Sequence, residues 1–192
     1  MQQNRDPLGT RKTFMRRHLV YSIAALALIG AAVLLGNYVF VHRHLASVLD
    51  ADPRNKGVVA FAHYDCFVMP GTIVFDLRAV ADTTSPADIF RMLLQFAASR
   101  KESEYSAIKL AFRGEPKFLL KGNYFHTLGT EYGTQNPVYT MRTLPENLYR
   151  PDGTSAFGTW TGGLLGVLGQ QMEDFTEFHK QWYINDLAKT SG

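Results

Sequence analysis

The sequence has little cysteine, little charge and no low-complexity tract. One of its 192 residues is cysteine and 19% are charged, whereas 46% are hydrophobic. A single cysteine excludes an internal disulfide framework, and the apolar content excludes a disordered chain or a collagen-like repeat. The length allows one domain of ordinary size with an additional segment.

The sequence also lacks the short motifs of common catalytic and nucleotide-binding sites. It contains no Gly-Lys-Ser/Thr element, no Gly-x-Gly-x-x-Gly, no Gly-x-Ser-x-Gly and no His-Glu-x-x-His. After residue 44 there is no zinc-finger spacing, RNA-binding aromatic signature or block of Lys and Arg. We therefore expect no cofactor, no bound metal and no nucleic-acid partner.

One long uncharged run stands out near the N-terminus. Residues 19–41 carry no formal charge, and Ser22 and Asn37 are their only clearly polar side chains. About 20 helical residues cross a hydrocarbon core of about 30 Å. Tyr21 and Tyr38 lie near the two ends of the run, where tyrosine favours the headgroup layer. The run predicts a single transmembrane helix in contact with the lipid bilayer.

The charges on either side of the run predict its orientation. Only Arg43, between His42 and His44, follows it closely, whereas five basic residues and one acid, Asp6, precede it: Arg5, Arg11, Lys12, Arg16 and Arg17. The positive-inside bias then keeps the N-terminus in the cytoplasm and exports the C-terminal part. Residues 1–44 carry a net charge of +5 and residues 45–192 one of −2, so the basic character belongs to the anchor.

A cleavable signal peptide is the competing interpretation of this segment. Ala25 and Ala27 have the spacing of a cleavage site, but the apolar run continues well beyond the 7–15 residues typical of the hydrophobic region of a signal peptide. We therefore expect an uncleaved, single-pass anchor in the inner membrane. Small residues at helical spacing would let a second helix approach closely and support an oligomer; they are Ala27, Ala31, Ala32 and Gly36.

The predicted organisation is a basic cytoplasmic tail (1–18), the transmembrane helix (19–41), a stalk (42–56), an exported domain (57–188) and a frayed end (189–192). Within the domain, strands are expected at 58–64, 72–80, 107–112 and 117–120. Ser85, Pro86 and Asp88 mark the start of a helix between the second and third strands. The pattern predicts an α/β or α+β domain whose small mixed sheet, strand-helix-strand-strand, is covered by at least two helices.

The rest of the domain is less regular in sequence. A short amphipathic helix is expected from Asn123, and a final helix spans about 164–187. Residues 134–161 carry several prolines and glycines, and a short strand is expected at 138–142. Long irregular segments are often functional. This one is our candidate partner-binding region because it is rich in aromatic and guanidinium groups: Tyr132, Asn136, Tyr139, Arg142, Tyr149, Arg150 and Trp160. The alternative is an ordered loop that covers the core.

Catalytic and metal-binding alternatives have weaker support. Cys66 follows His63 by three residues, which on a strand places the two side chains on opposite faces. We expect Cys66 to be buried or incidental. His63, Asp65, His126 and His179 show no ligand spacing, and His179 is expected to be a hydrogen-bonded residue at the edge of the core. The Gly162–Gly169 stretch lacks the rest of a phosphate-binding motif.

Two classes of function fit these observations. The first is a non-catalytic envelope protein whose exported domain binds other proteins, as a component of an assembly or secretion-type complex or as an immunity-type inhibitor. The second is a membrane-tethered enzyme using distant residues such as His63 or His126, or a domain that binds glycan or lipid through Trp160, Tyr139 and Tyr149. The absence of a catalytic constellation favours the first.

Overall fold

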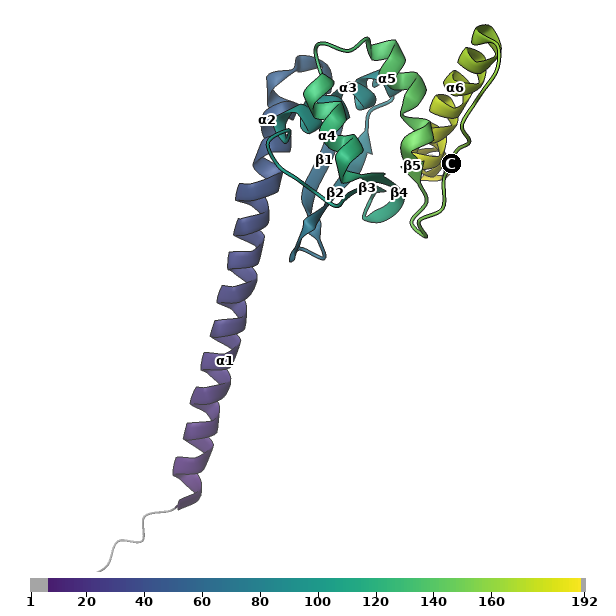
Figure 1. Cartoon of the computed structure of the whole chain (residues 1–192). Coiled ribbons are helices and arrows are strands. Elements are labelled where there is room, and N and C mark those ends of the chain that lie inside the picture. The colour runs from purple at the N-terminus through teal and green to yellow at the C-terminus, as the bar shows by residue number, and fades with distance from the viewer. Residues whose placement is uncertain (1–6, 191–192) are drawn as a thin grey trace, which may run out of the picture. The chain divides into compact units, whose positions relative to one another are not determined.

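A computed structural model describes residues 7–190 of the chain (Figure 1). The chain divides between Gly36 and Asn37 into two compact units. The first contains helix α1 (Pro7–Asn37) except for its last residue, and the second contains Asn37 and a mixed sheet with its helices.

Helix α1 is followed by a π-helical turn, η1 (Tyr38–His42), by α2 (Arg43–Ala51) and by the 3-10 turn η2 (Pro53–Asn55). Among the described residues, the stretch Arg17–Ala51 is the one helix long and apolar enough to cross a membrane. The run predicted from the sequence lies inside it. The segment expected to be a stalk, 42–56, forms α2 and η2, and its residue Leu45 is buried in the core of the domain.

The domain is built on a five-stranded mixed sheet. Strand order is β1-β2-β3-β4-β5, with β2 and β3 parallel and the other neighbours antiparallel. The strands are β1 (Val58–Asp65), β2 (Met69–Val80), β3 (Ala107–Phe112), β4 (Glu115–Lys121) and β5 (Leu148–Tyr149). The predicted mixed sheet is therefore confirmed, because the crossover through a helix makes β2 and β3 parallel and a tight turn makes β4 antiparallel.

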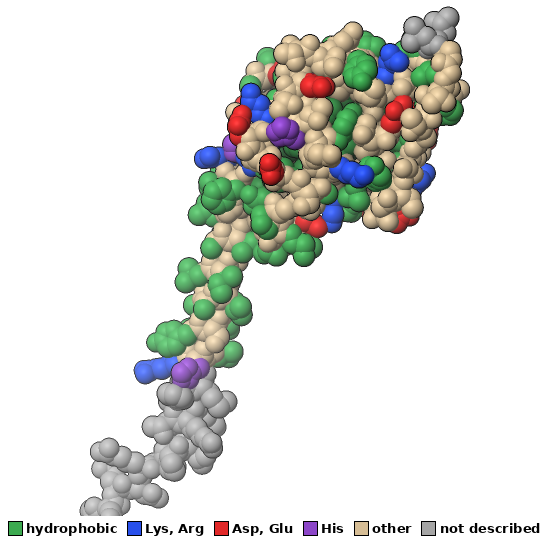
Figure 2. Space-filling model, viewed as in Figure 1, with side chains coloured by type: hydrophobic (Ala, Val, Ile, Leu, Met, Phe, Trp, Pro, Cys, Tyr) green, Lys and Arg blue, Asp and Glu red, His purple; other side chains and the backbone are tan. Residues whose placement is uncertain are grey.

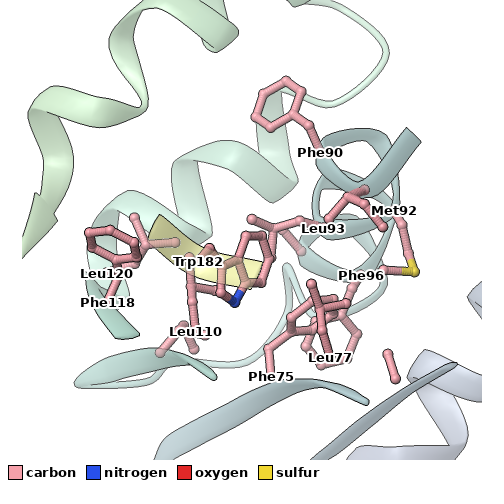
Figure 3. Packing of buried hydrophobic residues seen from close by; sticks show 14 of the residues in the cluster. Phe75, Leu77, Phe90, Met92, Leu93, Phe96, Leu110, Phe118, Leu120 and Trp182 are labelled. Carbon is pink, nitrogen blue, oxygen red and sulfur yellow. The ribbon is translucent and has the colours of Figure 1, made fainter. Parts of the chain in front are cut away.

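Helix α3 (Pro86–Ser99) is the crossover connection. Ser85 and Asp88 form a reciprocal capping box at its start, with Pro86 in the first turn. Its apolar face packs on one face of the sheet, where Phe75 lies opposite Leu110 in the β2–β3 register. Figure 3 shows side chains of α3 directed toward those of the strands, with Trp182 between them. The indole Nε1 of Trp182 donates a hydrogen bond of 3.0 Å to the carbonyl oxygen of Ala111, which fixes the C-terminal helix on the sheet.

Further helices complete the domain: α4 (Gly122–Glu131), α5 (Pro137–Thr143), η3 (Pro145–Asn147), α6 (Leu164–His179), the π-helical η4 (Lys180–Ile184) and α7 (Asn185–Thr190). The strand predicted at 138–142 is wrong, because this segment is α5. The side chain of Asn136 caps it by accepting a hydrogen bond of 2.9 Å from the Val138 amide, and Pro137 suits its first turn. These two start signals outweigh the β-branched and aromatic residues that suggested a strand.

Candidate binding pocket

An apolar pocket lies where α3, α4 and α5 meet. Its volume is about 480 Å³. The apolar part of its lining comes from all three helices and includes Phe90, Leu94, Leu128 and Met141. Ligand-binding sites in proteins are commonly concave and apolar, with a few polar groups at the edge. The pocket can therefore accept an apolar group of a partner.

A glycine allows α4 to approach α3 closely beside this pocket. A Cβ atom at Gly129 would lie 2.4 Å from the carbonyl oxygen of Ala97. No side chain fits at that distance, so the contact between the two backbones requires glycine. Leu128, the residue before Gly129, lines the same pocket as Phe90 and Leu94 of α3.

Arg91 lies at the pocket rim with its charge already paired. Its Nη1 lies 2.5 Å from Asp88 Oδ1, its Nε lies 3.3 Å from Asp52 Oδ2, and its Nη2 donates to Asn55 Oδ1 at 3.2 Å. Hydrogen bonds from Ser85 and then Arg91 lower the pKa of Asp88 to about 2. The guanidinium therefore links η2 and the residue before it to α3. Because its positive charge is balanced by two carboxylates, the pocket suits an uncharged group.

The predicted partner-binding residues fall into two sets, and the first lies at or next to the pocket. Tyr132 lines it and is 40% exposed. Asn136 caps α5, one residue before the pocket residue Pro137. Tyr139 is half exposed on α5. Tyr132 is thus the one predicted residue on the pocket wall.

The second set holds the irregular segment together. Nε of Arg142 donates to Gln171 Oε1 at 2.9 Å, and Arg150 donates to the carbonyl oxygens of Ser155 and Ala156. Lys121 Nζ lies 4.6 Å from the centre of the Tyr149 ring. The indole of Trp160 donates to Asp174 Oδ2 at 2.6 Å. The structure therefore gives Arg142, Arg150 and Trp160 intramolecular partners and does not bring them to the pocket.

The candidate catalytic residues do not come together. His63 lies on β1 with its ring stacked on Phe67, His126 is exposed on α4, and Asp65 Oδ2 pairs with Lys109 Nζ at 2.6 Å. Among the described residues, no group of three or more His, Cys, Asp or Glu could hold a metal ion. Cys66 is exposed in the β1–β2 turn, so the first of the two expectations for it, that it is buried, is wrong, and the second, that it is incidental, stays a prediction. Its backbone φ in this turn is 49°.

His179 is fully buried in the C-terminal helix. Its ring is surrounded by the rings of Phe175, Phe178, Trp182 and Tyr183. Neither ring nitrogen forms a hydrogen bond with another group in residues 7–190. The prediction of a hydrogen-bonded histidine at the edge of the core is therefore wrong, because His179 is fully buried and its ring is unpaired. Burial lowers the pKa of His179 to about 3, which makes the ring neutral at physiological pH.

The small residues expected to support helix packing lie on α1. Ala27, Ala31 and Ala32 are exposed and Gly36 is partly exposed, which leaves their helix surface open within the described chain.

Comparisons with protein-family models, with curated proteins and with solved structures found no match to this chain.

Proposed function

We propose that this chain is a single-pass protein of the cell envelope whose exported domain binds another protein through the α3–α4–α5 pocket. The pocket accepts an uncharged, apolar side chain from the partner, and Tyr132 contacts it at the rim. The observation that carries the proposal is an open apolar pocket of about 480 Å³ in a domain that follows a helix long enough to cross a membrane. No cofactor or reaction is part of the proposal.

The anchor part of the proposal rests on length and charge. The stretch Arg17–Ala51 has 35 residues, more than the roughly 20 needed for a crossing. The basic residues before the uncharged run support an N-terminus in the cytoplasm and a domain in the periplasm or its extracytoplasmic equivalent. A phosphatase fused after Gly192 should be active only when exported. A fusion active only in the cytosol would contradict this orientation.

The binding part is supported by the lining of the pocket. Apolar contacts are offered by Phe90, Leu94, Leu128 and Met141, and the positive charge of Arg91 is balanced by the carboxylates of Asp52 and Asp88. Tyrosine is enriched at the centres of protein interfaces because it combines a large apolar area with one polar atom. A protein partner is therefore favoured over a phosphate or nucleotide, which would need a free cationic group.

A paired substitution at Ala87 tests the pocket. Ala87 lines the pocket but is exposed, so a larger side chain there fills the pocket without disturbing the core. We expect Ala87→Phe to weaken partner binding at least about tenfold, or about 1.4 kcal/mol, whereas Ala87→Ser keeps the affinity. The measurement is photocrosslinking in intact membranes from a benzophenone amino acid at position 132. The proposal requires a discrete protein adduct that Ala87→Phe reduces and Ala87→Ser does not.

The matching control places the same photoprobe at Lys101, which is exposed after the end of α3. No adduct sensitive to position 87 is expected from Lys101. If position 132 crosslinks to no protein, or if the adduct is unchanged in Ala87→Phe, the pocket is not the binding site.

A further inference from the structure

The turn between β1 and β2 exposes an uncharged, apolar tip. Residues 66–71 read Cys-Phe-Val-Met-Pro-Gly, and all six are exposed. Phe67, Val68 and Met69 have exposed fractions of 37%, 63% and 54%. Figure 2 shows hydrophobic side chains gathered at the end of the domain that carries this hairpin. A convex cluster of this kind is unfavourable in water and marks a surface with an apolar partner.

The backbone of the tip is bonded within the turn. The Phe67 amide donates to the Tyr64 carbonyl at 2.8 Å, and the Val68 amide donates to the Asp65 carbonyl at 3.2 Å. Positive φ values at Cys66 and Phe67 make this tight turn. Because these amides are paired inside the hairpin, the tip can enter an apolar medium at a lower cost.

Asn37 joins the tip to the last residues of the uncharged run. Its Nδ2 donates to the Phe67 carbonyl at 2.7 Å, and its Oδ1 accepts from the Tyr64 amide at 2.8 Å. Asn37 lies four residues before the end of the uncharged run at Val41, a rise of about 6 Å along a helix. If that run crosses the bilayer, the tip lies level with its last turn.

The same contacts account for a polar residue inside the apolar run. An asparagine amide in hydrocarbon is unfavourable unless both of its ends are hydrogen-bonded. Asn37 is 3% exposed, and the hairpin backbone supplies a partner to each end of its amide. On the same segment Tyr38 and Phe40 are more than half exposed, so their rings are available to the interface.

The charges near the tip agree with this depth. Arg43 is the first charged residue after the uncharged run, and it is exposed. At the base of the hairpin, Asp65 is paired with Lys109, and both are largely buried. The six tip residues carry no charge, so insertion would bring no charged group into the lipid.

We propose that the hairpin tip, residues 66–71, inserts into the headgroup–acyl boundary of the leaflet from which the transmembrane helix emerges. The lipid is the occupant because the tip is apolar and exposed and is bonded through Asn37 to the end of the uncharged run, where Tyr38 and Phe40 are also exposed. The inference rests on the proposed membrane anchor and is separate from the protein-binding pocket.

The native cysteine provides the test. Cys66 is the only cysteine in the chain and lies in the tip, so a nitroxide can be attached there without any substitution. The full chain is reconstituted in vesicles of phosphatidylethanolamine and phosphatidylglycerol. Power-saturation spectroscopy then compares collisions with lipid-soluble oxygen and with a water-soluble nickel complex. The control is Cys66→Ser combined with Thr83→Cys, since Thr83 is exposed just past the opposite end of β2.

We expect the probe at 66 to favour oxygen and the probe at 83 to favour nickel. Adding Val68→Asp should abolish the oxygen preference at 66, whereas Thr83→Asp should leave it unchanged. Carbonate extraction of the same vesicles tests the membrane anchor separately from the insertion of the tip. A retained protein whose Cys66 probe favours nickel overturns tip insertion alone, and a protein stripped from the vesicles overturns the anchor and the insertion together.

Discussion

Asn37 and His179 are both polar and both buried, yet their hydrogen bonding differs. The amide of Asn37 is paired at both ends with the backbone of the β1–β2 hairpin. The two ring nitrogens of His179 form no hydrogen bond with any group in the described residues, and aromatic rings surround them.

The difference shows two uses of a buried polar residue. Asn37 replaces water with specific partners, and so it ties one loop to one helix. The buried position of His179 in the aromatic cluster is stable only while the ring is neutral, because a buried charge without a partner is strongly unfavourable. The first residue specifies a contact at any pH, whereas the second makes the stability of the domain depend on pH.

Removing the histidine should have the largest effect. Burial lowers the pKa of His179 to about 3 from the ordinary value of 6.5. As the pH falls below 6.5, the unfolded chain gains a proton that the folded chain excludes, so the free energy of unfolding decreases by up to about 1.4 kcal/mol per pH unit. This contribution is fully present above pH 6.5 and is lost toward pH 3. Between pH 7 and pH 4, the native protein should lose about 3 kcal/mol more than His179→Leu.

The measurement is urea unfolding of the full chain in detergent, followed by tryptophan fluorescence at both pH values. Carboxylates such as Asp88 and Asp186, whose pKa values are lowered to about 2 by hydrogen bonds, contribute equally to both proteins and cancel in the difference. Parallel stability curves for the two proteins would show that His179 is protonated or hydrated in the folded state.

Removing the paired asparagine should be destabilising at every pH. Asn37→Leu leaves the Tyr64 amide and the Phe67 carbonyl without their partner, which should cost about 1–3 kcal/mol. The free energy of unfolding is measured as above, together with the mobility of a nitroxide at Cys66. Tyr38→Leu, at an exposed neighbouring position, is the control and should change stability by less than about 0.5 kcal/mol. Equal effects of the two substitutions would contradict the role of Asn37 in linking the tip to the helix.

The smallest effect should have the opposite sign. The hydroxyl of Tyr183 is buried and forms no hydrogen bond within residues 7–190, and burial raises the pKa of this phenol. Tyr183→Phe removes an unpaired polar atom and should raise the unfolding free energy by about 1 kcal/mol. Trp182→Phe loses the hydrogen bond to Ala111 and should lower it. A destabilised Tyr183→Phe would mean that the hydroxyl has a partner, such as bound water, in solution.

The regular part of the fold can be predicted from the sequence because its signals are local. The capping residues Ser85 and Asp88 and the period of β2 predict a strand followed by a helix, and both are present. Residues 138–142 could not be assigned correctly from their composition. There the cap formed by Asn136 and the proline after it determine a helix, although valine and tyrosine favour a strand.

The candidate pocket could be predicted only in part. Tyr132 was identifiable as an aromatic residue in an irregular region, and it does line the pocket. Phe90, Leu94 and Leu128 look in sequence like ordinary core residues of amphipathic helices. They form a pocket because three helices meet there, and the contact of Gly129 with Ala97 that sets this arrangement joins residues 32 positions apart. A periodic pattern within one helix carries no information on such a contact.

The helical segment from Asn37 to Ala51 has a consequence for any partner. It rises about 21 Å at about 1.5 Å per residue, and the next residue, Asp52, lies 3.3 Å from Arg91 at the pocket rim. Because Asn37 is bonded to the tip, a tip at the lipid limits the height of the pocket rim above the lipid to roughly 20 Å. A partner anchored in the same bilayer must therefore bridge the gap with a rigid stem of about 14 helical residues or with a shorter extended tether.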